Sequence, residues 1–252
     1  MAAARRALEL NPQSAEAHTS LAAATAFYTC DAESAFGDFE QAIALDPDYA
    51  SAWHFYGVVL FGRKLYDRAL QALQRAQSLD PLSPIFGVQI ASLHYLRREF
   101  RKAASLCDDL IRLDPEFWPA RWFGGMALEQ LGRTEEAIRY LQMAVGRSRG
   151  SHWPLAALGH LAASTGREDQ AVSIASELER RRESGHCSAA AIALVHVGLR
   201  RHERAFHWLD IARLEHSPFF VMFFAGDPRL DCIRADPRCQ SLAKACCGVS
   251  RV

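Results

Sequence analysis

Few residues in this sequence have the types and spacing that catalysis would require. The segment HERAFH contains His202 and His207, but histidines five residues apart point about 140° away from each other on a helix, and a zinc-binding helix needs them four apart. No phosphate-binding glycine loop, dinucleotide fingerprint or Gly-x-Ser-x-Gly motif occurs. The carboxylates are scattered, and no pair is placed to act as acid and base. The sequence therefore predicts that the protein is not an enzyme and holds no cofactor.

The seven cysteines are the remaining candidates for a metal site or for disulfides. Four of them, Cys232, Cys239, Cys246 and Cys247, lie near the end of the sequence. They form no close C-x-x-C pair, and Pro237 interrupts the run that could align them along a helix. An odd number of cysteines without paired short spacings is typical of reduced thiols, so we expect no metal ligands and a cytoplasmic location.

Composition and charge exclude several other classes. Half of the 252 residues are hydrophobic, which is enough for a sizeable core and too much for a disordered chain. The 29 basic and 29 acidic side chains cancel, so we expect no direct nucleic-acid binding by this segment, since such binding needs a basic face. The longest apolar stretch, 218–226, is far shorter than the roughly 20 residues of a membrane-spanning helix, and we expect no membrane span.

The elements that would position any binding surface are helices, and they recur with a fixed period. Four prolines, Pro12, Pro47, Pro81 and Pro115, follow Asn or Asp at separations of 35, 34 and 34 residues. Proline cannot continue a helix, and the residue before it avoids the helical region, so each pair predicts the end of one helix and the start of another. A period of this size indicates an array of helical repeats.

Other positions recur in phase with these prolines. One helical stripe contains Trp53, Tyr56, Gly57 and Leu60, which predicts an amphipathic first helix in the unit. A second amphipathic helix is expected to follow it in each unit. Small residues are expected where helices approach closely. They recur on the first helix at Gly57, Ala91, Gly125 and Gly159, and on the second helix at Ala35, Ala69, Ala103, Ala137, Ala171 and Ala205. Gly132 and Gly166 are predicted at the turn between the two helices.

The run WHFYGVVL, which begins at Trp53, resembles the W-x-x-L-G-x-x-Y pattern of the tetratricopeptide repeat (TPR) family. The third unit departs from that pattern at Gly87 and Cys107. The resemblance implies an all-α, right-handed helix-turn-helix solenoid of about six TPR units with a short C-terminal capping segment. The expected division is half of a truncated repeat at 1–12, units at 13–47, 48–81, 82–115, 116–149, 150–183 and 184–218, and a cap at 219–252.

The same resemblance implies a concave groove lined by the first helices, which would bind a protein or peptide partner. By the family's pattern the groove residues are His54, Phe61, Ser92, Tyr95, Trp122, Met126, Glu129 and His160, and we expect Trp153, just ahead of its helix, to join them. Packing against adjacent repeats is the alternative role for each of them, because a shift of one residue in helix phase exchanges the two. The lysine and asparagine pattern of members that bind chaperone C-termini is absent from these faces, so that partner is disfavoured.

The segment DPRLDCIRADPRCQSL, 227–242, resembles the closing segment of many bacterial multi-repeat regulators. In that group the repeats follow a winged-helix domain, a nucleotide cyclase or a Ser/Thr kinase. We therefore expect a protein–protein interaction module that is the C-terminal sensory or scaffolding part of a bacterial transcriptional or signalling regulator. The alternatives are a non-catalytic segment of a cyclase or kinase and a small-ligand sensor. The half repeat at 1–12 predicts further protein upstream, and its unpaired face predicts a homodimer.

Overall fold

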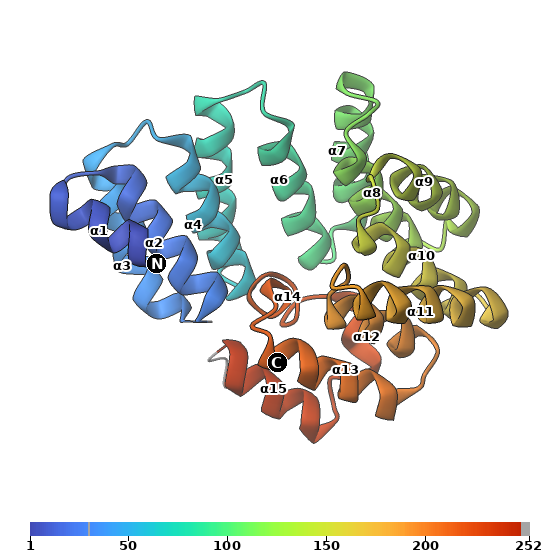
Figure 1. Cartoon of the computed structure of the whole chain (residues 1–252). Coiled ribbons are helices and arrows are strands. Elements are labelled where there is room, and N and C mark those ends of the chain that lie inside the picture. The colour runs from blue at the N-terminus through green and yellow to red at the C-terminus, as the bar shows by residue number, and fades with distance from the viewer. Residues whose placement is uncertain (30, 248–252) are drawn as a thin grey trace. The chain divides into compact units, whose positions relative to one another are not determined.

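The computed structural model of the protein describes residues 1–29 and 31–247 (Figure 1). Within these ranges the chain folds into fifteen α-helices and one 3-10 helix and contains no β-strand, so the predicted all-α fold is confirmed. The last residues of the predicted cap, 248–252, lie outside the described residues.

The helices belong to two compact units, which we describe separately. Unit 1 comprises Met1–Leu93, His216–Gly226 and the residues from Ala243 onward, and unit 2 comprises His94–Glu215 and Asp227–Leu242. Unit 1 contains α1 (Ala2–Leu10), α2 (Ala15–Tyr28), α3 (Ala32–Leu45), α4 (Ala50–Gly62), α5 (Tyr66–Leu79) and α14 (Pro218–Met222). Unit 2 contains α7 (Phe100–Leu113), α8 (Trp118–Gln130), α9 (Thr134–Arg147), α10 (His152–Ser164), α11 (Glu168–Glu183), α12 (Ala189–Gly198), α13 (His202–Leu214) and the 3-10 helix η1 (Pro228–Ile233). Two helices, α6 (Pro84–Leu96) and α15 (Pro237–Cys247), have residues in both units.

Consecutive helices pack in pairs in both units. In unit 1, α2 packs against α3 and α4 against α5, and in unit 2 the pairs are α8 with α9, α10 with α11, and α12 with α13. First helices of successive pairs also contact each other, α2 with α4 and α8 with α10 with α12. This is a helical repeat solenoid, as predicted. The predicted unit boundaries remain a prediction, with which these helix ends are compatible.

Buried alanines show why the repeat period holds. The six recurring alanines of the second helices are all fully buried, at 0 % exposure: Ala35, Ala69, Ala103, Ala137, Ala171 and Ala205. On the first helices the glycines are as tightly placed, since a Cβ at Gly57 would lie 2.8 Å from Leu73 Cγ and one at Gly125 would lie 2.7 Å from Leu141 Cγ. Each pair of helices is thus held close by a position at which a larger side chain does not fit.

The hinge between two pairs is built around the Asp-Pro step that the sequence repeats. Helix α3 ends at Leu45, and Asp46 turns to an extended conformation (φ −139°, ψ 92°) before Pro47. The Asp46 carboxylate accepts a hydrogen bond from the Asp48 N–H (3.0 Å), which closes the turn. The indole N–H of Trp53 then donates to the Pro47 carbonyl (2.9 Å), so this side chain fastens α4 to the hinge.

The same bond to the proline carbonyl recurs six residues after two other hinge prolines. Arg121 donates to the Pro115 carbonyl (3.0 Å), and His18 Nε2 lies 3.1 Å from the Pro12 carbonyl. In the third unit that position is Gly87, which has no side chain to make the bond. The departure of the third unit from the repeat pattern therefore removes a specific hinge contact.

Five of the turns between the two helices of a pair contain a residue with a left-handed backbone. Gly132 (φ 72°) and Gly166 (φ 77°) adopt this conformation, which confirms their predicted place at the turn. Lys64, Arg98 and Arg200 adopt the same conformation at the turns α4–α5, α6–α7 and α12–α13, with φ between 55° and 65°. A residue with a Cβ costs roughly 1–2 kcal/mol there, so the glycine turns carry less backbone strain.

Two glycine substitutions are expected to change stability in opposite directions. Gly132→Ala forces a Cβ into a left-handed turn and is expected to lower the free energy of unfolding by about 1–2 kcal/mol. Gly37 lies inside the exposed face of α3, and a Cβ there would meet nothing within 4 Å. Gly37→Ala is therefore expected to raise the free energy of unfolding by about 0.5–1 kcal/mol. Urea unfolding of both variants checks the pair, and effects of the same sign would contradict it.

Candidate functional site

The predicted groove residue His54 lies on α4 of unit 1 between aromatic rings. Its imidazole centroid is 5.2 Å from that of Phe86 on α6 and 4.9 Å from that of Phe55. Burial of the ring lowers the pKa of His54 to about 4, so the side chain is neutral near pH 7. A neutral imidazole packed in this way acts as an aromatic surface element rather than as a cation.

Phe61, the second predicted residue on α4, is 1 % exposed. Its ring lies 6.3 Å from that of Phe223, which belongs to the short chain segment 216–226 of the same unit. Two other predicted residues are also buried, Ser92 on α6 (0 %) and Met126 on α8 (1 %), and the Ser92 hydroxyl donates to the Gln89 carbonyl (2.8 Å). The side chains of Phe61, Ser92 and Met126 are thus all covered in this structure. Their role in a groove remains a prediction.

Tryptophans from two neighbouring first helices of unit 2 form a stack. The rings of Trp122 on α8 and Trp153 on α10 have centroids 6.1 Å apart and planes 30° apart, and Trp118, one turn before Trp122, lies 6.1 Å from it. Trp122 is 9 % exposed, whereas Trp118 and Trp153 are half-buried. The structure thus brings two predicted residues together and adds a third. The spacing of four residues in WPARW was the signal for Trp118.

The other predicted residues of unit 2 take part in two buried polar clusters. The Glu129 carboxylate on α8 lies 2.7 Å from His160 Nδ1 on α10, and both side chains are less than a tenth exposed. The Tyr95 hydroxyl, on α6, donates to the Asp227 carboxylate (3.2 Å). Burial, together with the negative charge of Asp227, raises the pKa of Tyr95 well above its ordinary value.

Asp227 itself is fully buried and is paired with Arg229. The Arg229 guanidinium donates to both carboxylate oxygens, with Nη2 2.6 Å from Oδ2 and Nε 3.0 Å from Oδ1. Burial alone would raise the pKa of Asp227, but attraction to Arg229 and the hydrogen bonds from it hold that pKa below its ordinary value. The Asp-Pro-Arg motif was visible in the sequence, but nothing in the repeat pattern indicated that it would meet Tyr95.

A cavity of about 710 Å³ adjoins this region of unit 2. It is lined by the C-terminal ends of α8, α10 and α12 and by η1, with Glu129, His160, Arg229 and Cys232 among its residues. The 3-10 helix η1 packs against α12, and its Leu230 and Ile233 are buried. η1 therefore closes one side of the cavity, through Pro228, Arg229, Asp231 and Cys232.

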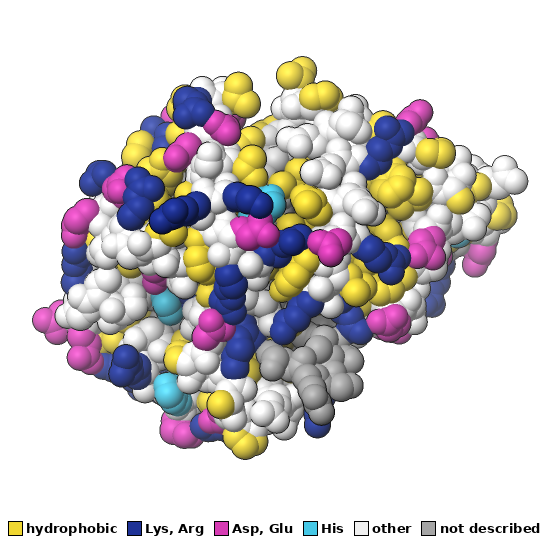
Figure 2. Space-filling model, turned by 180° about the vertical axis from the view of Figure 1, so that it is seen from behind, with side chains coloured by type: hydrophobic (Ala, Val, Ile, Leu, Met, Phe, Trp, Pro, Cys, Tyr) yellow, Lys and Arg dark blue, Asp and Glu magenta, His cyan; other side chains and the backbone are white. Residues whose placement is uncertain are grey.

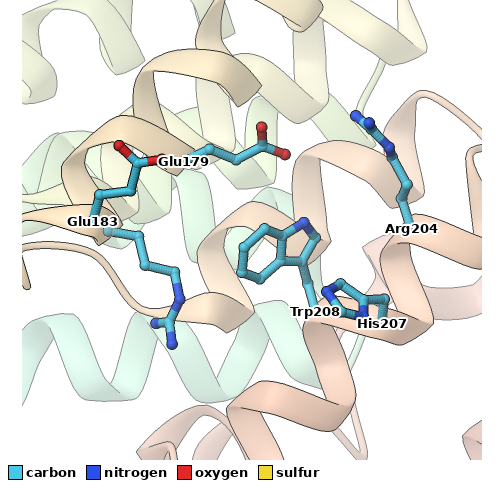
Figure 3. Close-up of a pocket in the computed structure, with 6 residues that line it drawn as sticks. Glu179, Glu183, Arg204, His207 and Trp208 are labelled. Carbon is cyan, nitrogen blue, oxygen red and sulfur yellow. The ribbon is translucent and has the colours of Figure 1, made fainter.

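A second cavity, of about 590 Å³, lies between α11 and α13, the second helices of their pairs (Figure 3). Glu179 and Glu183 come from α11, and Arg204, His207 and Trp208 come from α13. The Arg182 guanidinium lies 5.7 Å from the centroid of the Trp208 ring and also pairs with Glu215. The sequence pattern indicated His207 only as a possible metal ligand and did not predict this surface.

Neither metal ligands nor a membrane helix stand out in the part of the chain that the structure describes. No group of three or more His, Cys, Asp or Glu residues is placed to hold a metal ion among the described residues, and the side chains of Cys246 and Cys247 lie outside them. Within the same residues, no helix is both long enough and apolar enough to span a membrane. On the face drawn in Figure 2, basic and acidic side chains lie interspersed.

Comparison with protein families identifies the repeats. The family model described as "Tetratricopeptide repeat" matches residues 25–84 and 88–152, which contain helix pairs from both units. The chain is a tetratricopeptide repeat protein. TPR repeats generally serve as non-catalytic scaffolds for protein–protein interactions, and this chain has the fold of such a scaffold. No curated protein sequence matches it.

Solved structures of other TPR proteins are similar in fold. Yeast Tom70 superposes with a TM-score of 0.61 at 20 % identity, covering 95 % of this chain and 51 % of that one. PilW, a type IV pilus biogenesis factor, superposes with a TM-score of 0.60 at 20 % identity, covering 72 % of this chain and 84 % of that one. Pseudomonas aeruginosa pilF superposes with a TM-score of 0.54 at 24 % identity, covering 70 % of this chain and 80 % of that one. At these identities the likeness shows the fold alone.

Proposed function

We propose that this TPR protein binds a peptide or helix of a partner protein on the first helices of unit 2, at the stack formed by Trp118, Trp122 and Trp153. The observation that carries the proposal is the stacking of indoles from two successive first helices, α8 and α10, with part of two rings exposed. Tryptophan dominates binding hot spots because a large, rigid surface is buried at low cost in conformational entropy. Apolar and cationic side chains of the partner suit such a surface.

The wider setting of the proposal is a bacterial transcriptional or signalling regulator in the cytoplasm, of which the chain is the C-terminal sensory or scaffolding part. The resemblance of 227–242 to the closing segment of such regulators supports it, and reading the gene upstream of the Met1 codon tests it. A frame that continues into a winged-helix domain favours the transcriptional setting. A cyclase or kinase domain favours the alternative, in which the repeats serve an enzyme without contributing catalytic residues.

Truncating the exposed edge of the stack should weaken partner binding. Trp153→Ala is expected to reduce capture of the partner at least tenfold, which corresponds to about 1.4 kcal/mol and is modest for a hot-spot tryptophan. Trp208→Ala removes the same side chain from the second helix α13 and provides the matched control. Titration of the captured partner against the full chain measures both, and equal loss in the two variants would contradict a site at the stack.

The small-ligand alternative makes a different prediction. A metabolite held in the 710 Å³ cavity would raise the melting temperature, because any ligand of the native state stabilises it. A screen in which metabolites produce no shift while a protein partner is captured would reject this alternative.

The proposal includes self-association through α1. This helix packs against α2 but buries none of its own residues, and Leu10 is 73 % exposed. An exposed apolar face favours association with a second copy. Sedimentation equilibrium of the wild type and of Leu10→Glu tests this, and a monomer at all concentrations would refute it.

A further inference from the structure

The longest apolar stretch of the sequence folds back within unit 1. Residues His216–Gly226 are counted with unit 1, although the chain before and after them belongs to unit 2. Their short helix α14 contacts α4 and α2, two first helices of the repeats. Most of the segment is hidden, with Phe219, Phe220 and Phe224 at 2 %, 1 % and 0 % exposure. A peptide-like segment is therefore seated on first helices of unit 1.

The contact with α4 depends on the absence of a side chain at its last residue. A Cβ at Gly62 would lie 2.9 Å from the carbonyl carbon of Val221 and closer still to its oxygen. These are backbone atoms, so they cannot move aside as the end of a flexible side chain could. One residue earlier, the buried ring of Phe61 lies 6.3 Å from the ring of Phe223. The C-terminal end of α4 thus fits the backbone and an aromatic side chain of this segment.

The segment carries the features of a helix-in-groove ligand. It has one helical turn, Pro218–Met222, and aromatic residues packed upon each other, with Phe219 6.3 Å from both Phe223 and Phe224. Aromatic anchors at helical spacing are what a groove between helices recognises in a partner peptide. Because the segment is covalently attached, its effective concentration at the groove is of the order of millimolar, and a free peptide must compete with it.

We propose that the face formed by α2 and the C-terminal end of α4 is a binding groove for a short aromatic helical turn, and that residues 217–226 are its resident ligand. A partner protein that carries an aromatic turn of the same chemistry binds there by displacing the resident segment. The inference rests on the proposed function in one respect, that TPR first helices bind partner segments. It concerns a different part of the chain, and its test needs no external partner.

The test uses a labelled synthetic peptide with the sequence SPFFVMFFAG of 217–226 and a lysine tag for solubility. In the 252-residue chain, Phe219→Asp with Phe223→Asp places two charges in the apolar segment and releases it, while α2 and α4 are unchanged. The peptide is expected to bind this variant at least tenfold more tightly than it binds the wild type. Adding Gly62→Ala should abolish that binding, whereas adding Gly37→Ala, on α3 where a Cβ would meet nothing within 4 Å, should preserve it.

Equal binding of the peptide to the wild type and to the released variant, or no binding to a released variant with a native circular dichroism spectrum, would overturn the proposal. If the released variant does not fold, Gly62→Ala alone provides the measurement. Cleavage by chymotrypsin after the phenylalanines of 219–224 is expected to be at least tenfold faster in Gly62→Ala than in Gly37→Ala or the wild type. Unchanged cleavage would equally overturn it. Loss of partner capture by Trp153→Ala bears only on the proposed function.

Discussion

Replacing Asp227 by alanine is expected to lower the free energy of unfolding by about 3–5 kcal/mol, because it leaves Arg229 as a buried charge without its carboxylate. The Arg229 side chain is only 3 % exposed and donates through Nε and Nη2 to Asp227 alone among the described residues. The substitution also removes the acceptor of the Tyr95 hydroxyl, which is fully buried. Urea unfolding of the full chain measures the change.

Two variants separate the buried charge from other causes of instability. Asp231→Ala removes the same side chain four residues later, where it is 52 % exposed and pairs with Arg98 and Arg234, and is expected to cost less than about 1 kcal/mol. Adding Arg229→Met to Asp227→Ala removes the stranded charge and should restore part of the lost stability. A double variant that is less stable than Asp227→Ala would contradict this explanation.

The same pair sets a sign for the pH dependence. Because the pKa of Asp227 is held below its ordinary value in the folded protein, the unfolded chain binds a proton at higher pH than the folded protein does. The stabilisation that Asp227 contributes is therefore fully present above about pH 4, the ordinary pKa of an aspartate. It is lost as the pH falls through the pKa of Asp227 in the folded protein. Asp227→Asn should remove this part of the acid dependence.

The repeat pattern predicted those parts of the fold that depend on contacts within one period. The step at Asp46 and Pro47 specified where α3 stops, and the phase of Ala69 and its equivalents specified which face of each second helix is buried. Both features depend on local contacts, because in a quasi-one-dimensional array each repeat packs only on its neighbours. The sequence therefore predicted the helices, their pairing and the glycine turns at Gly132 and Gly166.

The tail, which is the part of the chain after α13, could not be predicted from the repeat pattern, because it has no phase in the repeat. Tyr95 and Asp227 are 132 residues apart, and no periodic position connects them. The run PFFVMFFAG was recognised as apolar and too short to span a membrane, but hydrophobicity alone does not specify which helices it covers. The seat on α4 depends on Gly62, whose missing side chain matters only once the backbone of Val221 is beside it. For the same reason Phe61 could be assigned to the first-helix face but not to a contact with the tail.

Acidification is expected to destabilise the protein through His54, and His54→Phe should remove that effect. Burial lowers the pKa of this histidine from its ordinary value of 6.5 to about 4. Between these two values the unfolded chain binds a proton that the folded protein does not, so stability falls as the pH drops from 6.5 to 4 and then levels off. Each pKa unit corresponds to about 1.4 kcal/mol. With allowance for the partial exposure of the ring, the free energy of unfolding is expected to fall by about 2–3 kcal/mol.

Phenylalanine keeps an aromatic ring beside Phe55 and Phe86 and carries no titratable group. It also removes the Nε2 of His54, a buried atom with no hydrogen-bond partner among the described residues, so the variant should be at least as stable as the wild type at pH 7.5. The measurement is urea unfolding of both proteins at pH 7.5 and pH 4.5. His152 and His196, whose pKa values burial also lowers, contribute to both proteins, so the difference between the two pH dependences isolates His54. A difference near zero would mean that solvent reaches the imidazolium in the folded state, and α4 would then present His54 to a partner as a charge rather than as a neutral ring.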